Sequence, residues 1–142
     1  MSTNYFIEPM SVSDADTAMR WMDARIRQHS GNPNVVFPRL WVPKTGQAVL
    51  DDAGRLYAVS FVYFEKTAEI AYCGWLLANP RNTARESYRA VKMLVNAMPT
   101  YARANGAKCL LTVYGNRGIN RMLEKSGFTN GENCESKFKL LF

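Results

Sequence analysis

Two arginines, Arg81 and Arg85, flank the point where an apolar strand is expected to give way to a long helix. The apolar run from 70 to 78 predicts a strand buried on both faces, and residues 79–83, Asn-Pro-Arg-Asn-Thr, are typical of a turn. The first turn of a helix carries a partial positive charge and backbone N–H groups without partners. The arrangement predicts a cradle for an anion such as phosphate. An ordinary strand-to-helix connection with solvated arginines is the alternative.

The helix after this turn is predicted by apolar residues that recur three and four positions apart on one face. They are Tyr88, Val91, Leu94, Val95, Met98 and Ala102. Pro99 lies inside the pattern, and because proline removes a helix hydrogen bond, a kink or a break is expected there. Asn105 and Gly106 are typical of a helix end.

The rest of the chain predicts further elements around this unit. Strands are expected at 5–9, 47–50, 56–64, 108–114 and 136–142, and helices at 13–28 and 116–126. Ser13, with Asp16 three residues later, resembles a capping box at the start of the first helix. Two strands around a turn, followed by the strand at 70–78, should form an antiparallel meander. At 142 residues the chain is expected to form one domain, residues 1–142, of the α/β (α+β) class.

The segment from 29 to 46 is long for a connection within a compact domain. It combines three prolines and two glycines with an apolar patch that includes Phe37, Leu40 and Trp41. A short helix is expected at 35–41. The aromatic residues either pack on the core or line one wall of a substrate cleft, and the sequence favours neither.

Composition and charge argue against several classes of protein. No apolar run is long enough to cross a membrane, and the N-terminus lacks the pattern of a secretion signal, so a cytoplasmic protein is expected. Three scattered cysteines, Cys73, Cys109 and Cys134, and one histidine favour buried thiols over disulfides or a metal site. The formal charge of +6 favours anionic partners. Because the basic residues are spread along the chain and do not form a clustered stripe interleaved with aromatic residues, nucleic acid is not expected.

Residues 116–128 carry the most specific motif, in which an Asn ends a strand and a short helix leads to Gly-Phe. With this motif and the order of its elements, the chain resembles the GNAT family of N-acetyltransferases over almost its whole length. The matching residues are Asn116, Glu124, Lys125, Gly127 and Phe128. The resemblance implies the GNAT fold, with a mixed central sheet of about six to seven strands flanked by helices.

The resemblance also implies acetyl-CoA (or CoA) as cofactor, with its pantetheine along the strand and its pyrophosphate at the turn. The implied cofactor-binding residues are Leu76, Leu77, Ala78, Arg81, Asn82, Thr83, Ala84, Arg85 and Asn116. Glu86 stands where the family has a small residue. Its bulk and negative charge are expected to disfavour a diphosphate.

Two candidate catalytic residues follow from the same resemblance. Glu69 aligns with the glutamate that acts as general base in the histone acetyltransferase branch; the alternative is a glutamate that faces solvent or pairs with Lys66. Leu123 occupies the position of the family's catalytic tyrosine and cannot donate a proton. Tyr114 is the candidate to replace it, with Ser126 as the alternative, and a structural role is open for both. A thiolate can also leave without strong acid help, because thiols have a pKa of about 8.5.

Two functions are compatible with these residues. The first is an acyl-CoA-dependent N-acyltransferase that moves an acetyl group from acetyl-CoA to an unidentified primary amine on a small molecule or a protein. The second is a catalytically degenerate GNAT-like module that binds another protein or serves as a phage-associated structural protein, because short GNAT-like proteins of tailed phages have similar loops. Glu86 and Leu123 favour the second. A homodimer is left open.

Overall fold

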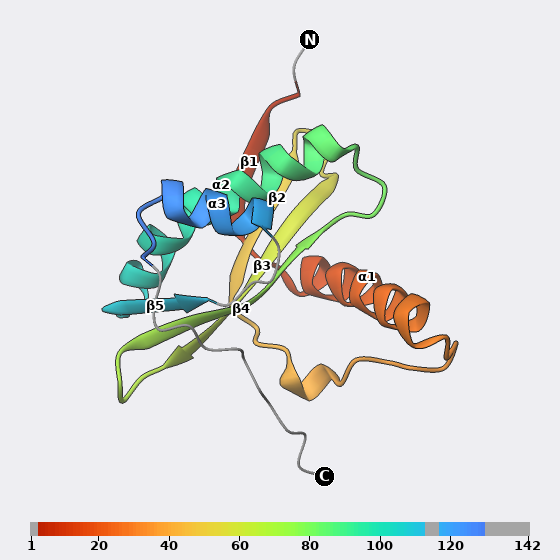
Figure 1. Cartoon of the computed structure of the whole chain (residues 1–142), viewed down its shortest axis with the longest axis horizontal. Coiled ribbons are helices and arrows are strands. Elements are labelled where there is room, and N and C mark those ends of the chain that lie inside the picture. Colours follow the sequence, from red (N-terminus) through yellow and green to blue (C-terminus); the bar gives the residue numbers. More distant parts are fainter. Residues whose placement is uncertain (1–2, 113–116, 130–142) are drawn as a thin grey trace.

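The computed structural model describes residues 3–112 and 117–129, which form a mixed sheet with helices on both of its faces (Figure 1). The strands are β1 (Tyr5–Pro9), β2 (Gly46–Asp51), β3 (Leu56–Glu65), β4 (Ile70–Ala78) and β5 (Cys109–Thr112). They lie side by side in sequence order. The first four are antiparallel neighbours, which confirms the predicted meander, and β5 is parallel to β4.

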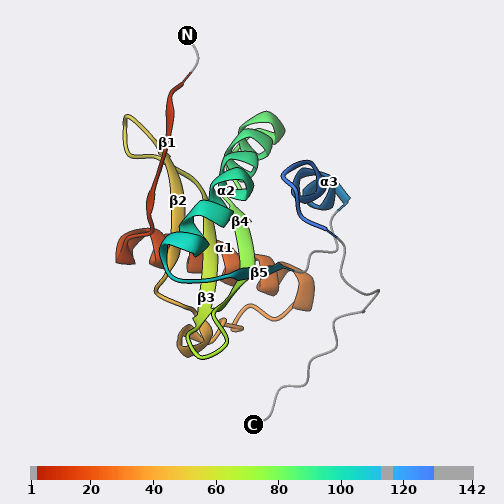
Figure 2. The same cartoon turned by 90° about the vertical axis from the view of Figure 1, so that its left-hand side faces the viewer.

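The helices are α1 (Val12–Ser30), α2 (Ala84–Ala104) and α3 (Arg117–Lys125), with a short 3₁₀ helix, η1 (Arg39–Trp41), in the segment after α1. Parallel neighbouring strands need a crossover connection, and α2 supplies it between β4 and β5. Two views at right angles place α1 on one face of the sheet and α2 with α3 on the other (Figures 1 and 2).

Each face of the sheet has its own buried cluster, because side chains alternate along each strand. Ala58 and Val62 on β3 pack toward α2, whereas Val59 and Phe61 pack toward α1. The α2 face is covered by Ala90, Val91, Leu94, Val95, Met98 and Ala102, all predicted from the sequence except Ala90. Tyr88 was also predicted on this face, but it is 51% exposed. Burying a side chain such as Leu94 contributes about 1.5–3 kcal/mol, so packing accounts for most of the stability of this helix.

The first helix begins one residue before the predicted start, and its N-cap lies two residues earlier than predicted. Ser11, not Ser13, is the N-cap, and a capping box joins Ser11 and Asp14: each backbone N–H donates to the other residue's side chain at 3.0 Å. The sequence repeats the Ser-x-x-Asp pattern two residues apart, and the earlier copy gives the longer helix.

Pro99 does not break α2, which runs from Ala84 to Ala104. Met98 and Ala102 on either side of it are buried against the sheet, and this packing holds the helix together where one hydrogen bond is lost. The helix begins directly after the predicted turn at 79–83, so Arg85 and Glu86 belong to its first turn.

The described sheet has five strands rather than the predicted six to seven. The closing strand expected at 136–142 lies outside the described residues. The expectation of a buried strand at 108–114 was also wrong for the described part, because Cys109 and Leu111 are exposed. β5 is the last described strand, and among the described residues the cluster under α1 contains none from β5.

Candidate functional site

The strands β4 and β5 separate halfway along β4. Their register runs from Ile70 opposite Cys109 to Cys73 opposite Thr112, and no described strand pairs with the β5 side of residues 74–78. A bulge lies at this point, because Phe61 pairs with Trp75 and Val62 with Cys73, which leaves Gly74 as the extra residue. We call the unpaired edge of residues 74–78 the β4 opening.

The register shows which backbone groups face the β4 opening. The N–H of Asn79 donates to the carbonyl of Tyr57 at 2.9 Å, so this residue pair is a hydrogen-bonded one in the β3–β4 ladder. In an antiparallel ladder, such pairs alternate with pairs whose groups point away. Leu77 and Trp75 therefore bond to β3, and the N–H and C=O groups of Leu76 and Ala78 point into the opening.

The turn after β4 is fixed to β3 by two asparagines. The side-chain amide of Asn79 donates to the carbonyl of Leu56 and its oxygen accepts from the N–H of Arg81, both at 2.9 Å. The side-chain amide of Asn82 donates to the carbonyl of Tyr57 at 2.9 Å. Asn82, predicted as a cofactor-binding residue, therefore has a structural role in shaping the turn. Asn79 has the same structural role, whereas the sequence predicted only that it lies in a turn.

The first turn of α2 caps itself. The N–H of Thr83 donates to Oε1 of Glu86 at 2.8 Å, and the N–H of Glu86 donates to Oγ1 of Thr83 at 3.1 Å. The N–H groups of Arg81 and Asn82 are also taken, by the side chain and the carbonyl of Asn79. Among the described residues, only Ala84 and Arg85 of the predicted cradle keep an N–H without a partner.

Arg55, in the turn between β2 and β3, is a site residue that sequence reasoning missed. Its guanidinium lies 3.5 Å from Oε2 of Glu86, donates to Oδ1 of Asn82 at 3.0 Å and stacks 4.5 Å from the centre of the Tyr57 ring. A positive charge thus lies beside the carboxylate that was expected to repel a diphosphate. In the sequence, Arg55 lies in a polar turn 31 positions away from Glu86, and no local pattern connects the two residues.

Arg81 and Arg85 are both exposed, and neither takes part in an ion pair or side-chain hydrogen bond among the described residues. They are available to a ligand at the end of β4. Leu76, Leu77 and Ala78 precede them on the strand, and Thr83 and Ala84 start the helix, so seven of the nine predicted cofactor residues lie together here with Asn82 beside them as the eighth. The ninth, Asn116, lies outside the described residues.

Glu69 is not brought to this site. It lies in the turn before β4, with a positive φ of 55°, and its carboxylate pairs with Nζ of Lys108 at 2.8 Å. At about 3.3 Å per residue along a strand, it is roughly 16 Å from the bulge at Gly74. The partner is Lys108 rather than Lys66, because β5 runs beside β4 and puts residue 108 next to residue 69.

The other predicted catalytic residue, Tyr114, lies outside the described residues. Leu123, at the position of the family's tyrosine, is 6% exposed and packs with Met122 in the cluster under α2. The hydroxyl of Ser126 is placed to donate to the carbonyl of Met122 and to Oδ1 of Asn96, both at 2.8 Å. Leu123 and Ser126 thus attach α3 to the rest of the molecule.

An aromatic wall lies on the α1 face of the sheet beside the bulge. It consists of Tyr63, Tyr72, Trp75 and Phe37. The Tyr63 ring centre lies 6.2 Å from that of Tyr72 and 6.0 Å from that of Trp75, and Phe37 packs edge-on to Trp75 at 4.9 Å. A side chain at Gly74 would place its Cβ 2.8 Å from the Tyr63 ring, so glycine makes room for the wall. Burial, together with the neighbouring Tyr72, raises the pKa of Tyr63 to about 12.

The segment from 31 to 45 is attached to α1 by a buried carboxylate. Asp23 accepts hydrogen bonds from the N–H of Phe37 at 2.8 Å and from both terminal nitrogens of Arg39, at 2.7 and 3.2 Å. These bonds, above all those from Arg39, hold the pKa of Asp23 below its ordinary value, although burial opposes the shift. The predicted helix at 35–41 is reduced to η1. Phe37 packs on the core and also borders the aromatic wall, whereas Leu40 is 99% exposed.

The described residues contain no group of three or more His, Cys, Asp or Glu side chains placed to hold a metal ion. None of their helices is long and apolar enough to cross a membrane. Of the three cysteines, Cys73 is buried and Cys109 exposed, and Cys134 lies outside the described residues.

Comparison with known proteins shows the fold. No family model and no curated protein matches the sequence, but solved structures match over nearly the whole chain. A protein described as a probable acetyltransferase matches with a TM-score of 0.67 at 12% identity, covering 96% of this chain and 98% of its own. The chain has the GNAT fold. The prediction made from the motif at 116–128 and the order of elements is thereby confirmed at the level of the fold.

Two further structures with this fold differ in substrate. One is an aminoglycoside acetyltransferase from an uncultured soil metagenomic sample, in complex with sisomicin (TM-score 0.63, 13% identity, 97% of both chains). The other is glucosamine-6-phosphate N-acetyltransferase from Arabidopsis thaliana (TM-score 0.57, 13% identity, 95% of this chain and 98% of that one). At these identities the likeness is one of fold, so the substrate has to be argued from the residues of this chain.

Proposed function

We propose that this GNAT-fold protein is an acyl-CoA-dependent N-acyltransferase that moves an acetyl group from acetyl-CoA to a primary amine. The observation that carries the proposal is the β4 opening, where the backbone groups of Leu76 and Ala78 face a strand edge with no described partner. Unpaired backbone groups on a strand edge can pair with an extended polar chain, and the amide-containing pantetheine arm of CoA is such a chain.

The turn after β4 supplies the second part of the cofactor site. The pyrophosphate of CoA would lie at the start of α2, where neither the N–H groups of Ala84 and Arg85 nor the guanidinium groups of Arg81 and Arg85 have a partner among the described residues. The helix dipole favours negative charge at this end. Because Thr83 and Glu86 take up part of the cradle, we expect the pyrophosphate to be bound by the arginine side chains more than by backbone N–H groups.

The chemistry requires a neutral amine nitrogen to attack the thioester carbonyl. A C–N bond forms, the C–S bond breaks, the CoA thiolate leaves and the amine loses its proton. Among the described residues, no carboxylate lies at the bulge, and Glu69 is paired with Lys108 at the other end of β4. We propose that catalysis depends mainly on holding the amine against the thioester, with the proton passing to solvent or, as the sequence suggests, to Glu69 through water.

The aromatic wall is the proposed contact surface for the acceptor, because it borders the bulge at which the two strands separate. Tyr72 is 40% exposed there. Aromatic faces attract an ammonium group and cover an apolar chain, so an amine on an apolar scaffold suits this wall. The Asp23 carboxylate is already occupied by Arg39.

The proposal is tested by CoA release from acetyl-CoA in the presence of a panel of amines, with Ala78→Pro as the variant. Proline at 78 removes an N–H that faces the opening and leaves the β3 ladder intact. We expect the KM for acetyl-CoA to rise about tenfold, because losing one good hydrogen bond costs about 1.4 kcal/mol of binding free energy. Leu77→Pro is the matched control, because it removes a ladder N–H and should instead lower the melting temperature. Turnover unaffected by Ala78→Pro would exclude the opening as the cofactor site.

One set of contacts favours the second candidate, a GNAT-fold module without catalytic activity. Glu86 takes up part of the anion cradle from within the chain, and Leu123 is a core residue where the family has a tyrosine. Such a module would use the fold to bind another protein, and its partner would have to be sought by binding rather than by turnover.

A further inference from the structure

The positive charge of this protein is concentrated in one segment. Residues 81–125 hold nine Lys or Arg and two Asp or Glu, a net charge of +7, whereas the whole chain carries +6. The remaining 97 residues therefore sum to −1. This segment comprises α2, β5 and α3, and both helices lie on one side of the sheet.

On α2, the basic side chains form a row. Arg85, Lys92 and Arg103 are separated by 7 and 11 positions, which at 3.6 residues per turn places all three within about 20° of one another around the helix. All three are exposed. Tyr88, 51% exposed, lies between the first two, and Nζ of Lys92 lies 5.9 Å from the centre of its ring. The helix thus places an exposed aromatic residue in a row of basic ones, which is the pattern expected of a nucleic-acid surface and is not evident from the order of residues along the chain.

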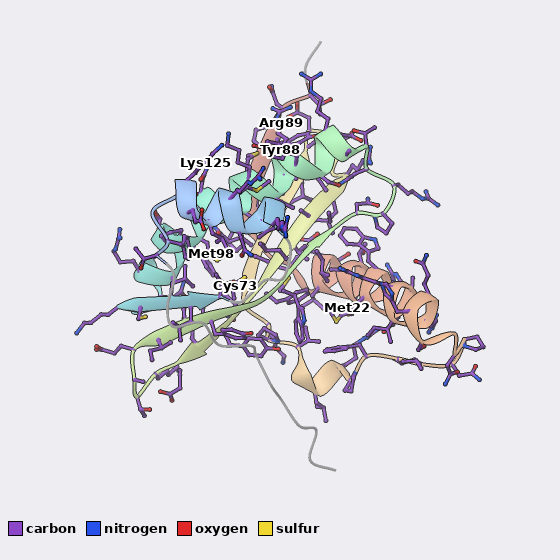
Figure 3. The ribbon with its side chains drawn as sticks, viewed as in Figure 1. Met22, Cys73, Tyr88, Arg89, Met98 and Lys125 are labelled. Atoms are coloured by element: carbon purple, nitrogen blue, oxygen red, sulfur yellow. The ribbon has the colours of Figure 1, made fainter. Side chains whose placement is uncertain are left out.

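On α3, a second basic row faces away from the core. Arg117, Arg121 and Lys125 recur every four residues and are exposed, whereas Met122 and Leu123 pack inward. The two helices are joined by the 2.8 Å hydrogen bond between Ser126 and Asn96. Asn96 is one turn after Lys92, and Ser126 is next to Lys125, so the rows meet. Tyr88 and Lys125 both lie on the α2–α3 side of the molecule (Figure 3).

These charges are not neutralised within the described part of the chain. Its three ion pairs join Arg39 to Asp23, Arg55 to Glu86 and Lys108 to Glu69, and none involves either row. Glu124 is the one acidic residue of α3. Arg89 is excluded from the surface, because it donates to the carbonyl of Thr3 and stacks on Tyr5. Keeping so many like charges together without counter-charges destabilises a fold, which favours a bound polyanion.

We propose that Tyr88, Lys92, Arg103, Arg117, Arg121 and Lys125 form a binding surface for single-stranded nucleic acid. The basic rows would neutralise phosphates, and Tyr88 would stack on a base. A flexible single strand can follow two rows that meet at an angle, whereas the acidic side chains of a protein would gain nothing from the exposed ring. Arg85 belongs to the proposed cofactor site and is left out of the surface.

The test is fluorescence anisotropy of a labelled oligothymidylate and a labelled oligouridylate, titrated with the full chain at several salt concentrations. Each neutralised phosphate on a single strand contributes about −0.7 to the slope of log K against log salt, so four to five contacts predict a slope of about −3. Lys92→Ala with Lys125→Ala should make the slope shallower by about 1.4. Arg25→Ala with Lys44→Ala, the same change of charge on α1 and the following segment, should leave the slope and Kd unchanged.

Tyr88→Ala separates stacking from charge. We expect it to weaken binding about tenfold or more at every salt concentration without changing the slope, because stacking on one aromatic ring accounts for about 1–3 kcal/mol per base. The proposal would be overturned if the oligonucleotide did not bind at low salt, or if the Arg25/Lys44 control lost as much affinity as the Lys92/Lys125 variant. It would also be overturned if polyglutamate bound as tightly as the oligonucleotide, or if acetyl-CoA displaced the oligonucleotide completely. The last would assign the surface to the cofactor. Acetyl-CoA binding measured separately shows whether the acyltransferase proposal fails independently.

Discussion

Glu86 and Thr83 form a reciprocal pair of hydrogen bonds at the start of α2, at 2.8 and 3.1 Å. The pair stabilises the helix end at which a diphosphate was expected, and Arg55 lies 3.5 Å from the same carboxylate. Glu86 is therefore not simply an obstacle at a position where the family has a small residue, since the helix begins where it does because Glu86 caps it. Helix capping and anion binding compete for the same N–H groups here.

Glu86→Gln should tighten acetyl-CoA binding several-fold, because glutamine retains the capping box but removes the negative charge and frees Arg55. Isothermal titration calorimetry measures the change in Kd. Glu86→Gly is the matched variant: it also removes the charge but loses the cap, which costs about 0.5–2 kcal/mol of stability. If neither variant binds more tightly than the wild type, charge at position 86 does not limit binding.

Arg81→Ala with Arg85→Ala should weaken acetyl-CoA binding by about tenfold or more and leave the melting temperature within about one degree, since both side chains are exposed and have no described partner. The control is Arg25→Ala with Lys66→Ala, which removes equal charge from exposed positions on α1 and in the turn between β3 and β4. An equal loss of affinity in the control would reduce the role of the two arginines to long-range attraction.

Glu69→Gln should change the rate of acetyl transfer less than about twofold if Glu69 lies roughly 16 Å from the bulge, as strand geometry implies. Lys108→Ala frees the carboxylate from its ion pair and serves as the partner variant. Rates with one amine are measured from pH 6 to 9. A rate that follows the pKa of the amine itself supports proton loss to solvent, whereas a hundredfold drop in Glu69→Gln would establish Glu69 as the base.

Asp23→Asn should lower the free energy of unfolding by about 1–3 kcal/mol at pH 7, because the N–H of Phe37 and the guanidinium of Arg39 lose a charged acceptor. The folded-state pKa of Asp23 lies below its unfolded value, so its contribution is present above about pH 4 and is lost as the pH falls through the lowered pKa. Urea denaturation at pH 7 and at pH 3 checks this. A difference that persists unchanged at pH 3 would show that the charge of Asp23 is not the cause.

Much of the fold followed from local patterns. The apolar run at 70–78 and the helical spacing from Val91 to Ala102 predicted β4 and α2, because the buried positions of these elements are occupied by apolar residues at a characteristic spacing. Boundaries were less accurate, since two overlapping Ser-x-x-Asp patterns compete at α1. The effect of Pro99 was overestimated, because tertiary packing on both sides of it outweighs one lost hydrogen bond.

The site was predictable only where it is continuous in sequence. Residues 76–85 could be placed together because a strand, a turn and a helix follow one another. Arg55, the bulge at Gly74 and the Glu69–Lys108 pair could not be, since each depends on which strands become neighbours. The basic surface was missed for a related reason: its residues lie on two helices separated by β5 and come together only when α3 packs on α2.

The central claim, that the β4 opening binds acetyl-CoA, is tested most directly by thermal unfolding with acetyl-CoA and with ADP. A ligand at about 100 times its Kd adds about 2.7 kcal/mol to the stability of the folded state, a shift of several degrees for a domain of this size. ADP carries the diphosphate but no pantetheine to pair with Leu76 and Ala78. The account predicts a clear shift with acetyl-CoA, a much smaller one with ADP, and loss of the difference in Ala78→Pro. No shift at millimolar acetyl-CoA, or equal shifts with both ligands, would contradict it.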